Sequence, residues 1–212
     1  MEQISSSRPV RRTQAERRDE SGRSLVEAAI AVVAREGVSA ATFDAIGREA
    51  GYSRGLATQR FGSKQGLIEA VITRLHEQQE AALIAHDIDS LPGGEAVLAF
   101  VDVYLRGLAG AHDGRAYFML LSAAVADATE LRAAFAEEHV RIERRLEGLV
   151  RKGQDEGSIR REIDPGAAAL MVGSLLFGLS MQMLVDPQTN LDPIRETSLA
   201  TLRLTFGAQG VQ

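Results

Sequence analysis

Two helical segments near the N-terminus are separated by only about three residues, and this short gap restricts the folds open to the chain. The first segment follows Thr42, reads F-D-A-I-G-R-E-A, and stops at Gly51. Thr42 is placed to cap the start of this helix, and Gly51 suits the left-handed backbone that often follows a helix. Ser53 is placed to cap the next helix. Two short helices joined this closely predict a helix-turn-helix over residues 42–61.

Helical signals continue along nearly the whole chain, and no segment shows the alternation typical of a β-strand. The strongest interruption is H-D-I-D-S-L-P-G-G at residues 86–94, which predicts a loop between two regions. We therefore predict an all-α fold. It comprises a flexible basic arm at residues 1–15, a helix-turn-helix domain with its connecting helix at 16–85, and a helical domain at 86–212. The helices expected in the last domain span residues 95–109, 116–126, 130–155, 166–185 and 192–206.

The composition favours a cytoplasmic protein that is not an enzyme. The chain has 212 residues, 45% of them hydrophobic, and no Cys, which excludes disulfides and thiolate metal sites. The N-terminus lacks the apolar run of a signal peptide. The four His residues are far apart, no nucleophile elbow occurs, and the glycine-flanked run at 148–153 is followed by Gln154 where a phosphate loop needs Lys. We expect no metal and no cofactor.

An uncharged run at residues 166–185 is as long as a membrane-spanning helix. It is rich in Ala and Gly, and Asp164 and Asp186 flank it in place of cationic or aromatic anchors. A helix that is apolar all round in such a chain is more often buried by its own core and a partner subunit. We therefore predict no membrane span.

The charges are unevenly distributed along the chain. Residues 1–64 contain 11 Lys and Arg against 8 Asp and Glu, whereas residues 65–212 contain 13 against 21. No carboxylate occurs between Glu49 and Glu69, although this interval holds three cations before Gln65. Chance alone can produce a small excess of this kind, but its position on the helix-turn-helix favours contact with a polyanion.

The second helix of a helix-turn-helix enters the major groove of DNA, so its first residues are the candidates for reading bases. Arg54 can make a bidentate contact to guanine, and Thr58 and Gln59 can bind polar base edges. Gly55 leaves room for the backbone to approach. Lys64 at the next helix start is unfavourable for the helix dipole, which favours a phosphate contact there.

The run T-F-D-A-I-G-R-E-A-G-Y-S-R-G-L-A-T-Q-R-F-G-S-K-Q-G-L-I-E-A-V, residues 42–71, resembles the DNA-binding region of TetR-family transcriptional regulators. The resemblance implies an N-terminal helix-turn-helix DNA-binding domain and a C-terminal helical domain for ligand binding and dimerisation. It further implies a homodimer through the helices at about 166–185 and 192–206. The matching positions are Thr42, Ile46, Ala50, Gly51, Ser53, Phe61, Lys64 and Leu67.

Three positions on the second helix depart from the family pattern. Thr58 stands where Tyr is frequent, Arg60 replaces His or Tyr, and Leu56 replaces Thr or Ala, so the choice of operator is left open. Gly47, where Ala is common, predicts close packing between the two helices of the motif. The arginines of the basic arm either follow the minor groove or belong to a disordered tail. The predicted DNA contacts are Thr42, Arg48, Ser53, Arg54, Gly55, Leu56, Thr58, Gln59, Arg60 and Lys64.

Regulators of this family bind a small molecule among their middle helices, so the resemblance implies an effector site in the second domain. Aromatic and Met side chains suit a hydrophobic or amphipathic ligand, although such residues also form ordinary core. The expected function is a dimeric repressor that leaves a near-palindromic double-stranded operator when its effector binds. Alternatives are an activator, a ligand-independent DNA binder, and a helical interaction module without DNA binding. The candidate ligand contacts are Tyr104, Tyr117, Phe118, Met119, Phe177, Met181 and Met183.

Overall fold

The computed structural model describes residues 13–110, 112–126 and 131–207. These residues form nine α-helices and two short 3-10 helices, and they contain no β-strand. The all-α fold predicted from the sequence is confirmed. The elements are α1 (Gln14–Glu36), η1 (Val38–Ala40), α2 (Phe43–Ala50), α3 (Arg54–Phe61), α4 (Lys64–Ala85), η2 (Ile88–Ser90), α5 (Gly93–Gly110), α6 (His112–Ala126), α7 (Leu131–Asp155), α8 (Pro165–Val185) and α9 (Leu191–Phe206).

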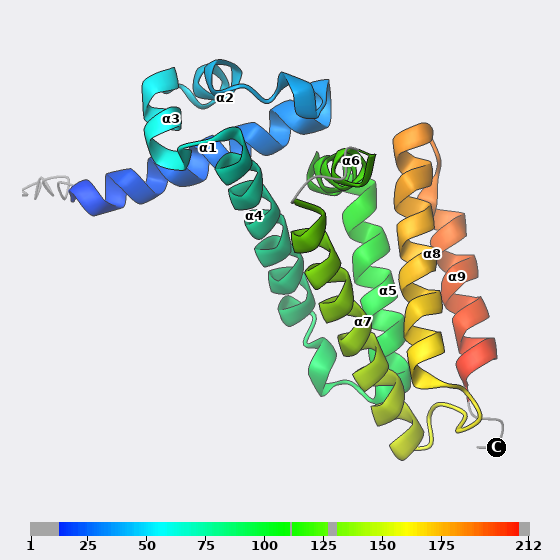
Figure 1. Cartoon of the computed structure of the whole chain (residues 1–212). Coiled ribbons are helices and arrows are strands. Elements are labelled where there is room, and N and C mark those ends of the chain that lie inside the picture. The colour runs from blue at the N-terminus through cyan, green and yellow to red at the C-terminus, as the bar shows by residue number, and fades with distance from the viewer. Residues whose placement is uncertain (1–12, 111, 127–130, 208–212) are drawn as a thin grey trace, which may run out of the picture.

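Helices α1 to α3 form one group, and α4 leads from this group to the remaining helices (Figure 1). Helices α5, α7, α8 and α9 run alongside one another, whereas α6 lies across one end of them, next to α1 (Figure 1). The connecting helix α4 ends at Ala85, where the sequence places its end. It contacts α1 and α3 on one side of the molecule and α5, α6 and α7 on the other.

The buried apolar side chains form two clusters. The first contains the inner faces of α1 to α4, with Leu25 and Ile46 fully buried, and the second contains the faces of α5, α7, α8 and α9 around Phe100. Helix α6 belongs to the first cluster through Phe118 and Leu121. The loop at 86–94 therefore separates segments of the chain, but it does not separate the two cores, because α6 follows it in sequence and packs on α1.

Helix α1 begins at Gln14, inside the segment 1–15 that the sequence assigns to a flexible arm. A capping box fixes this start. The Thr13 hydroxyl accepts from the Glu16 backbone N–H at 3.2 Å, and the Thr13 N–H donates to the Glu16 carboxylate at 2.7 Å. The rest of the predicted arm, residues 1–12 with Arg8, Arg11 and Arg12, lies outside the described residues.

Two helices of the second region begin earlier than the sequence predicts. Helix α5 starts at Gly93, within the predicted loop, because its first N–H groups are capped from the α7–α8 connection. The Gly93 N–H donates to the Glu156 carboxylate at 2.7 Å, and the Gly94 N–H to the Ser158 hydroxyl at 3.1 Å. Helix α6 starts at 112 in place of 116, with Asp113 in its first turn, where a carboxylate suits the helix dipole.

Helix α8 leaves much of its apolar surface uncovered. Asp164 caps it and Pro165 occupies its first turn, as the sequence pattern favours. Of the described helices, only α8 is long and apolar enough to cross a membrane, and 28% of its most apolar window is buried. The core of the chain therefore covers the smaller share of this helix, and burial by a partner subunit stays a prediction.

Candidate DNA interface and ligand cavity

The turn between α2 and α3 is fixed by two caps and one glycine. The Thr42 hydroxyl accepts from the Ala45 N–H at 3.2 Å and begins α2, and the Ser53 hydroxyl accepts from the Leu56 N–H at 3.2 Å and begins α3. Gly51 ends α2 with φ 74° and ψ 24°, the left-handed conformation that costs a side-chain-bearing residue more. The helix-turn-helix predicted from these residues is confirmed.

Gly47 brings the two helices of the motif close together. A Cβ atom at this position would lie 2.9 Å from the Tyr52 carbonyl oxygen and 3.2 Å from the Arg54 nitrogen. Both neighbours are backbone atoms, which cannot rotate away as a side chain can. The close packing predicted from Gly47 is therefore present, and it determines the angle at which α3 leaves the turn.

Helix α3 is anchored by one face and exposes the other. Ala57 is fully buried, and Leu56 and Phe61 are half-buried against the first core. Leu56, predicted as a DNA contact, therefore packs part of its side chain against the core. The outer face consists of exposed residues, all of them predicted as DNA contacts, namely Arg54, Gly55, Thr58 and Gln59. Arg60, also a predicted DNA contact, is exposed as well, but its guanidinium group lies beside Gly22 of α1.

The cations of α3 and of the α4 start have no counter-charges among the described residues. No hydrogen bond or ion pair joins the side chains of Arg54, Arg60 or Lys64 to another described residue. Arg48, a further predicted contact, instead pairs with Asp44 one turn away on α2. The positive charge of α3 and of the α4 start is therefore available to a polyanion, whereas that of Arg48 is partly neutralised.

Lys64 is the first residue of α4, and its position depends on another cap. The Ser63 hydroxyl accepts from the Gly66 N–H at 3.0 Å. The N–H groups of this helix start and the exposed side chain of Lys64 belong to the same first turn. Together they form an arrangement suited to a phosphate group.

A cavity of about 180 Å³ lies between α4, α5 and α6, beside the first core. Its wall is mostly apolar, with Tyr104 from α5 and with Tyr117 and Phe118 from α6. Burial raises the pKa of Tyr104 to about 12, and burial also raises the pKa of Tyr117, so both phenols stay neutral. The Tyr104 hydroxyl lies 3.3 Å from the Ser180 hydroxyl.

The cavity also has a small polar part, contributed by α4 and α6. The Gln78 side-chain oxygen is buried and has no hydrogen-bond partner among the described residues. Among the described lining residues, Asp113 is the single charged one. A buried acceptor without a partner is costly, so a bound molecule that donates a hydrogen bond would stabilise it.

Three of the seven predicted ligand residues line this cavity, and four do not. Tyr104, Tyr117 and Phe118 are brought together at its wall. The Met119 side chain lies on the side of α6 that faces α1. Its methyl group is close to Gly37, at 3.7 Å from the position that a Cβ atom of residue 37 would occupy. The other residues lie on α8: the Phe177 ring packs 5.6 Å from Phe118, the Met181 sulfur lies 3.8 Å from the Ser122 hydroxyl, and Met183 is half-buried.

Sequence reasoning missed the α4 side of the cavity. Leu75, Gln78, Gln79 and Ala82 line it and recur at helical spacing on one face. The polar pair at 78 and 79 interrupts an otherwise apolar stripe, which was the available signal.

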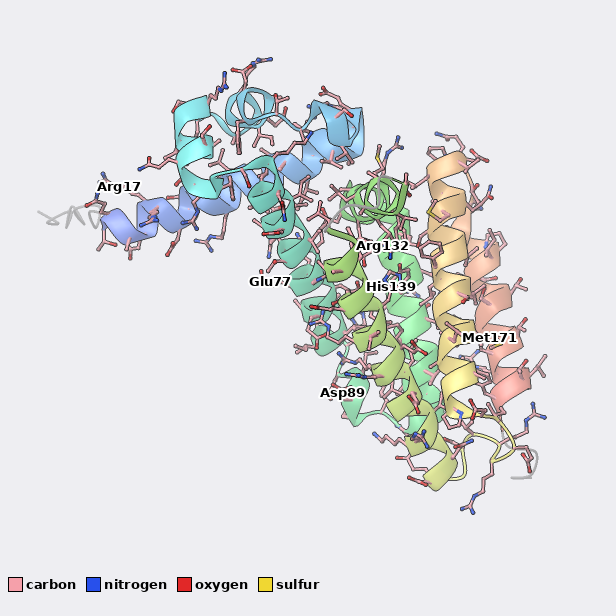
Figure 2. All side chains as sticks on the ribbon, in the orientation of Figure 1. Arg17, Glu77, Asp89, Arg132, His139 and Met171 are labelled. Atoms are coloured by element: carbon pink, nitrogen blue, oxygen red, sulfur yellow. The ribbon has the colours of Figure 1, made fainter. Side chains whose placement is uncertain are left out.

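A second group of residues that the sequence did not single out joins α4 to α7. Glu138 on α7 is buried, accepts a hydrogen bond from Arg141 at 2.8 Å, and lies 3.4 Å from the Nδ1 atom of His76 on α4. Arg145 on α7 bonds Glu80 at 2.8 Å and Asp89 at 2.9 Å. These pairs hold the connecting helix α4 against the second core. In Figure 2, His139 is labelled on α7 and Asp89 on η2.

Comparison with known proteins gives matches over both regions. The sequence model described as "Bacterial regulatory proteins, tetR family" matches residues 25–71, and "BetI-type transcriptional repressor, C-terminal" matches residues 92–206, more than half of the chain. HTH-type transcriptional regulator BetI from Vibrio campbellii is 37% identical over 68 residues. This match covers 32% of the chain and 34% of that protein, so it spans about a third of the relative's length.

Solved structures share the fold at low sequence identity. A Saccharomonospora viridis protein in complex with choline aligns with a TM-score of 0.77 and 19% identity, over 90% of this chain and 100% of that chain. The SmeT–triclosan complex aligns with a TM-score of 0.74 and 22% identity, over 91% and 94%. Both matching sequence models describe regulators rather than enzymes. Since one of them covers more than half of the chain and the other covers the helix-turn-helix, the protein belongs to the TetR family of DNA-binding transcriptional regulators.

Proposed function

We propose that this protein is a cytoplasmic, homodimeric repressor that releases a near-palindromic operator when a small amphipathic ligand enters the cavity beside α4. One observation carries the proposal. The helix that supplies the α4 wall of the cavity, from Leu75 to Leu83, begins with Lys64 directly after the recognition helix. A ligand that changes the position of α4 therefore changes the position of the DNA-facing surface.

The exposed face of α3 is the proposed base-reading surface. Arg54 lies in the first turn and has no partner within the described residues, so its guanidinium group is available for a bidentate contact to guanine. Thr58 and Gln59 follow on the exposed side, although the Thr58 hydroxyl already donates to the Arg54 carbonyl at 3.0 Å. We assign Lys64 and the α4 start to a phosphate.

Uncovered apolar surface supports a dimer through α8 and α9. Val185 on α8 is 79% exposed and Leu204 on α9 is 83% exposed. A shallow apolar groove runs between the two helices along Met171 and Ile194, and Figure 2 shows Met171 where α8 meets α9. Exposed apolar side chains beside an apolar groove are expected of a surface that a partner covers. A two-fold axis here would place two recognition helices about one DNA turn apart, roughly 34 Å, or a modest multiple of it.

The polar groups of the cavity favour a ligand with a positive charge and a hydrogen-bond donor. Aromatic rings of Tyr104, Tyr117 and Phe118 attract a cation through their faces, and the Gln78 oxygen needs a donor. The choline-bound relative holds a ligand with these properties. The triclosan-bound relative holds an apolar one, so ligand chemistry varies within this fold.

Operator selection followed by ligand competition tests the proposal. The purified chain selects binding sites from random duplex DNA, and fluorescence anisotropy of a selected duplex is then measured with choline, with its neutral isostere 3,3-dimethylbutanol, and with triclosan. We expect a near-palindromic site and release by choline at lower concentration than by the isostere. Release by triclosan alone contradicts the cationic ligand. A selected site that no compound in a broad screen affects supports a ligand-independent regulator, and failure to select any site supports an interaction module.

A further inference from the structure

Helix α1 contains a glycine where helix propensity favours almost any other residue. Gly22 lies in the interior of this helix of 23 residues, followed by the buried stripe that begins at Leu25. Glycine disfavours a helix interior relative to alanine because it loses more backbone freedom on folding. We therefore ask which neighbouring atoms occupy the space that a side chain at position 22 would need.

The side chain of Arg60 occupies that space. A Cβ atom at Gly22 would lie 2.8 Å from both Nε and Nη2 of Arg60, and 3.1 Å from its Cζ. The guanidinium group of α3 thus lies against the α1 backbone at the place where α1 has no side chain. Gly22 is buried in consequence, although Arg23 next to it is exposed.

The seated guanidinium group keeps its hydrogen-bonding capacity. No carboxylate or carbonyl among the described residues accepts a hydrogen bond from Arg60. Other arginines of this region are paired, as Arg35 is with Glu49 at 3.0 Å and Arg74 is with Glu27 at 2.7 Å. Arg60 is therefore held by packing along its Nε–Nη2 edge, while its Nη1 group, which is not among the three atoms nearest to the Gly22 Cβ position, remains available to an outside acceptor.

We propose that Gly22 is a positioning residue for DNA binding: it forms a seat that holds the Arg60 guanidinium group in place for an operator phosphate. This inference rests on the proposed DNA-binding surface of α3. A free Arg side chain loses considerable rotamer entropy when it binds, and prior packing of the planar group on α1 reduces that loss. The seat also favours Arg, because the Nε–Nη2 edge that lies beside Gly22 has no counterpart in the single ammonium group of Lys.

A double-mutant cycle of Gly22→Ala and Arg60→Ala on the full chain tests the seat. At Gly22→Ala the three atoms nearest to the added methyl group all belong to the flexible end of Arg60, so we expect the protein to fold with its helical circular dichroism and Tm not reduced. Gly148→Ala is the matched control, because this helical glycine of α7 is exposed and has no atom within 4 Å of the added Cβ.

The readout is affinity for a selected operator as a function of salt. Each lost phosphate contact lowers the salt slope by about 0.9, so a dimer that loses two contacts loses about 1.8. The ratio of the operator affinity of the wild type to that of Arg60→Ala then decreases about tenfold between roughly 50 and 200 mM salt. We expect Gly22→Ala to show a reduced slope, the double variant to match Arg60→Ala, and Gly148→Ala to match the wild type.

Several results overturn the inference. Wild-type affinity and slope in Gly22→Ala show that Arg60 needs no seat, and an equal loss from Gly22→Ala in the Arg60→Ala background shows that Gly22 acts through another contact. Arg60→Lys provides a test in which Gly22 stays intact: full affinity with Lys also contradicts the seat. If the wild type itself binds no selected duplex, the proposed function fails first, and this outcome is distinct from the others.

Discussion

The junction between α4 and α7 predicts that the protein loses stability as the pH falls below about 6.5. His76 on α4 is 16% exposed, and burial lowers its pKa below the ordinary value of 6.5, although the carboxylate of Glu138 raises it. Arg141 and His139 on α7 lower the pKa further. From α6, the neutral ring of Tyr117 packs 5.6 Å away.

The sign follows from proton linkage. Between the lowered native pKa of His76 and the unfolded value of 6.5, the unfolded chain binds more protons than the native protein. The free energy of unfolding therefore decreases as the pH falls through this window and is independent of His76 well above it. For a native imidazole that stays neutral, the loss between pH 7.5 and 5.5 is at most about 1.4 kcal/mol.

Urea denaturation at fixed protein concentration, at several pH values from about 5.5 to 7.5, measures this loss in the wild type and in His76→Gln. The Gln variant lacks the titrating group, so its unfolding free energy should fall less over this range. His86→Gln is the matched control, because His86 lies on the exposed end of α4 and forms no ion pair. Equal pH dependence in the wild type and His76→Gln refutes the reasoning.

Four further substitutions test other parts of the structure. Arg54→Ala should relax selection at one base position by about 1–3 kcal/mol in site-selection assays, whereas Lys64→Ala should weaken all sequences alike and lower the salt slope. Gly47→Ala places a Cβ 2.9 Å from the Tyr52 carbonyl, so urea denaturation should show a loss of about 1–3 kcal/mol. Leu204→Glu puts a charge on the uncovered α9 face, and sedimentation should show monomers where the wild type is dimeric.

The helix-turn-helix was predictable because its determinants are local. Thr42 and Ser53 bond to N–H groups three residues away, and Gly51 adopts a backbone conformation that its own lack of a side chain permits. No distant contact is needed to place these residues. The start of α5 at Gly93 was missed for the opposite reason, since its caps come from Glu156 and Ser158, more than sixty residues later.

The cavity was only partly predictable because it depends on which faces of distant helices meet. Tyr117 and Met119 are two residues apart on α6, yet one faces the cavity and the other faces Gly37. Composition marks both as apolar and adaptable, but only the packing of α6 on α1 separates them. The contact of Arg60 with Gly22 has the same character, because neither residue indicates its partner in the sequence.

The position of the cavity provides a route by which the proposed ligand would change the position of the DNA-facing helices. The first part of α4, through Leu75, packs in the first core, whereas Leu83 near its end packs in the second, and the cavity lies against the intervening turns. Close-packed cores resist gradual deformation, so we expect a ligand that does not fit this cavity to displace helices that line it, α4 and α6 among them. Both helices contact α1, and α4 also contacts α3. Either displacement therefore reaches the helices that hold the recognition surface.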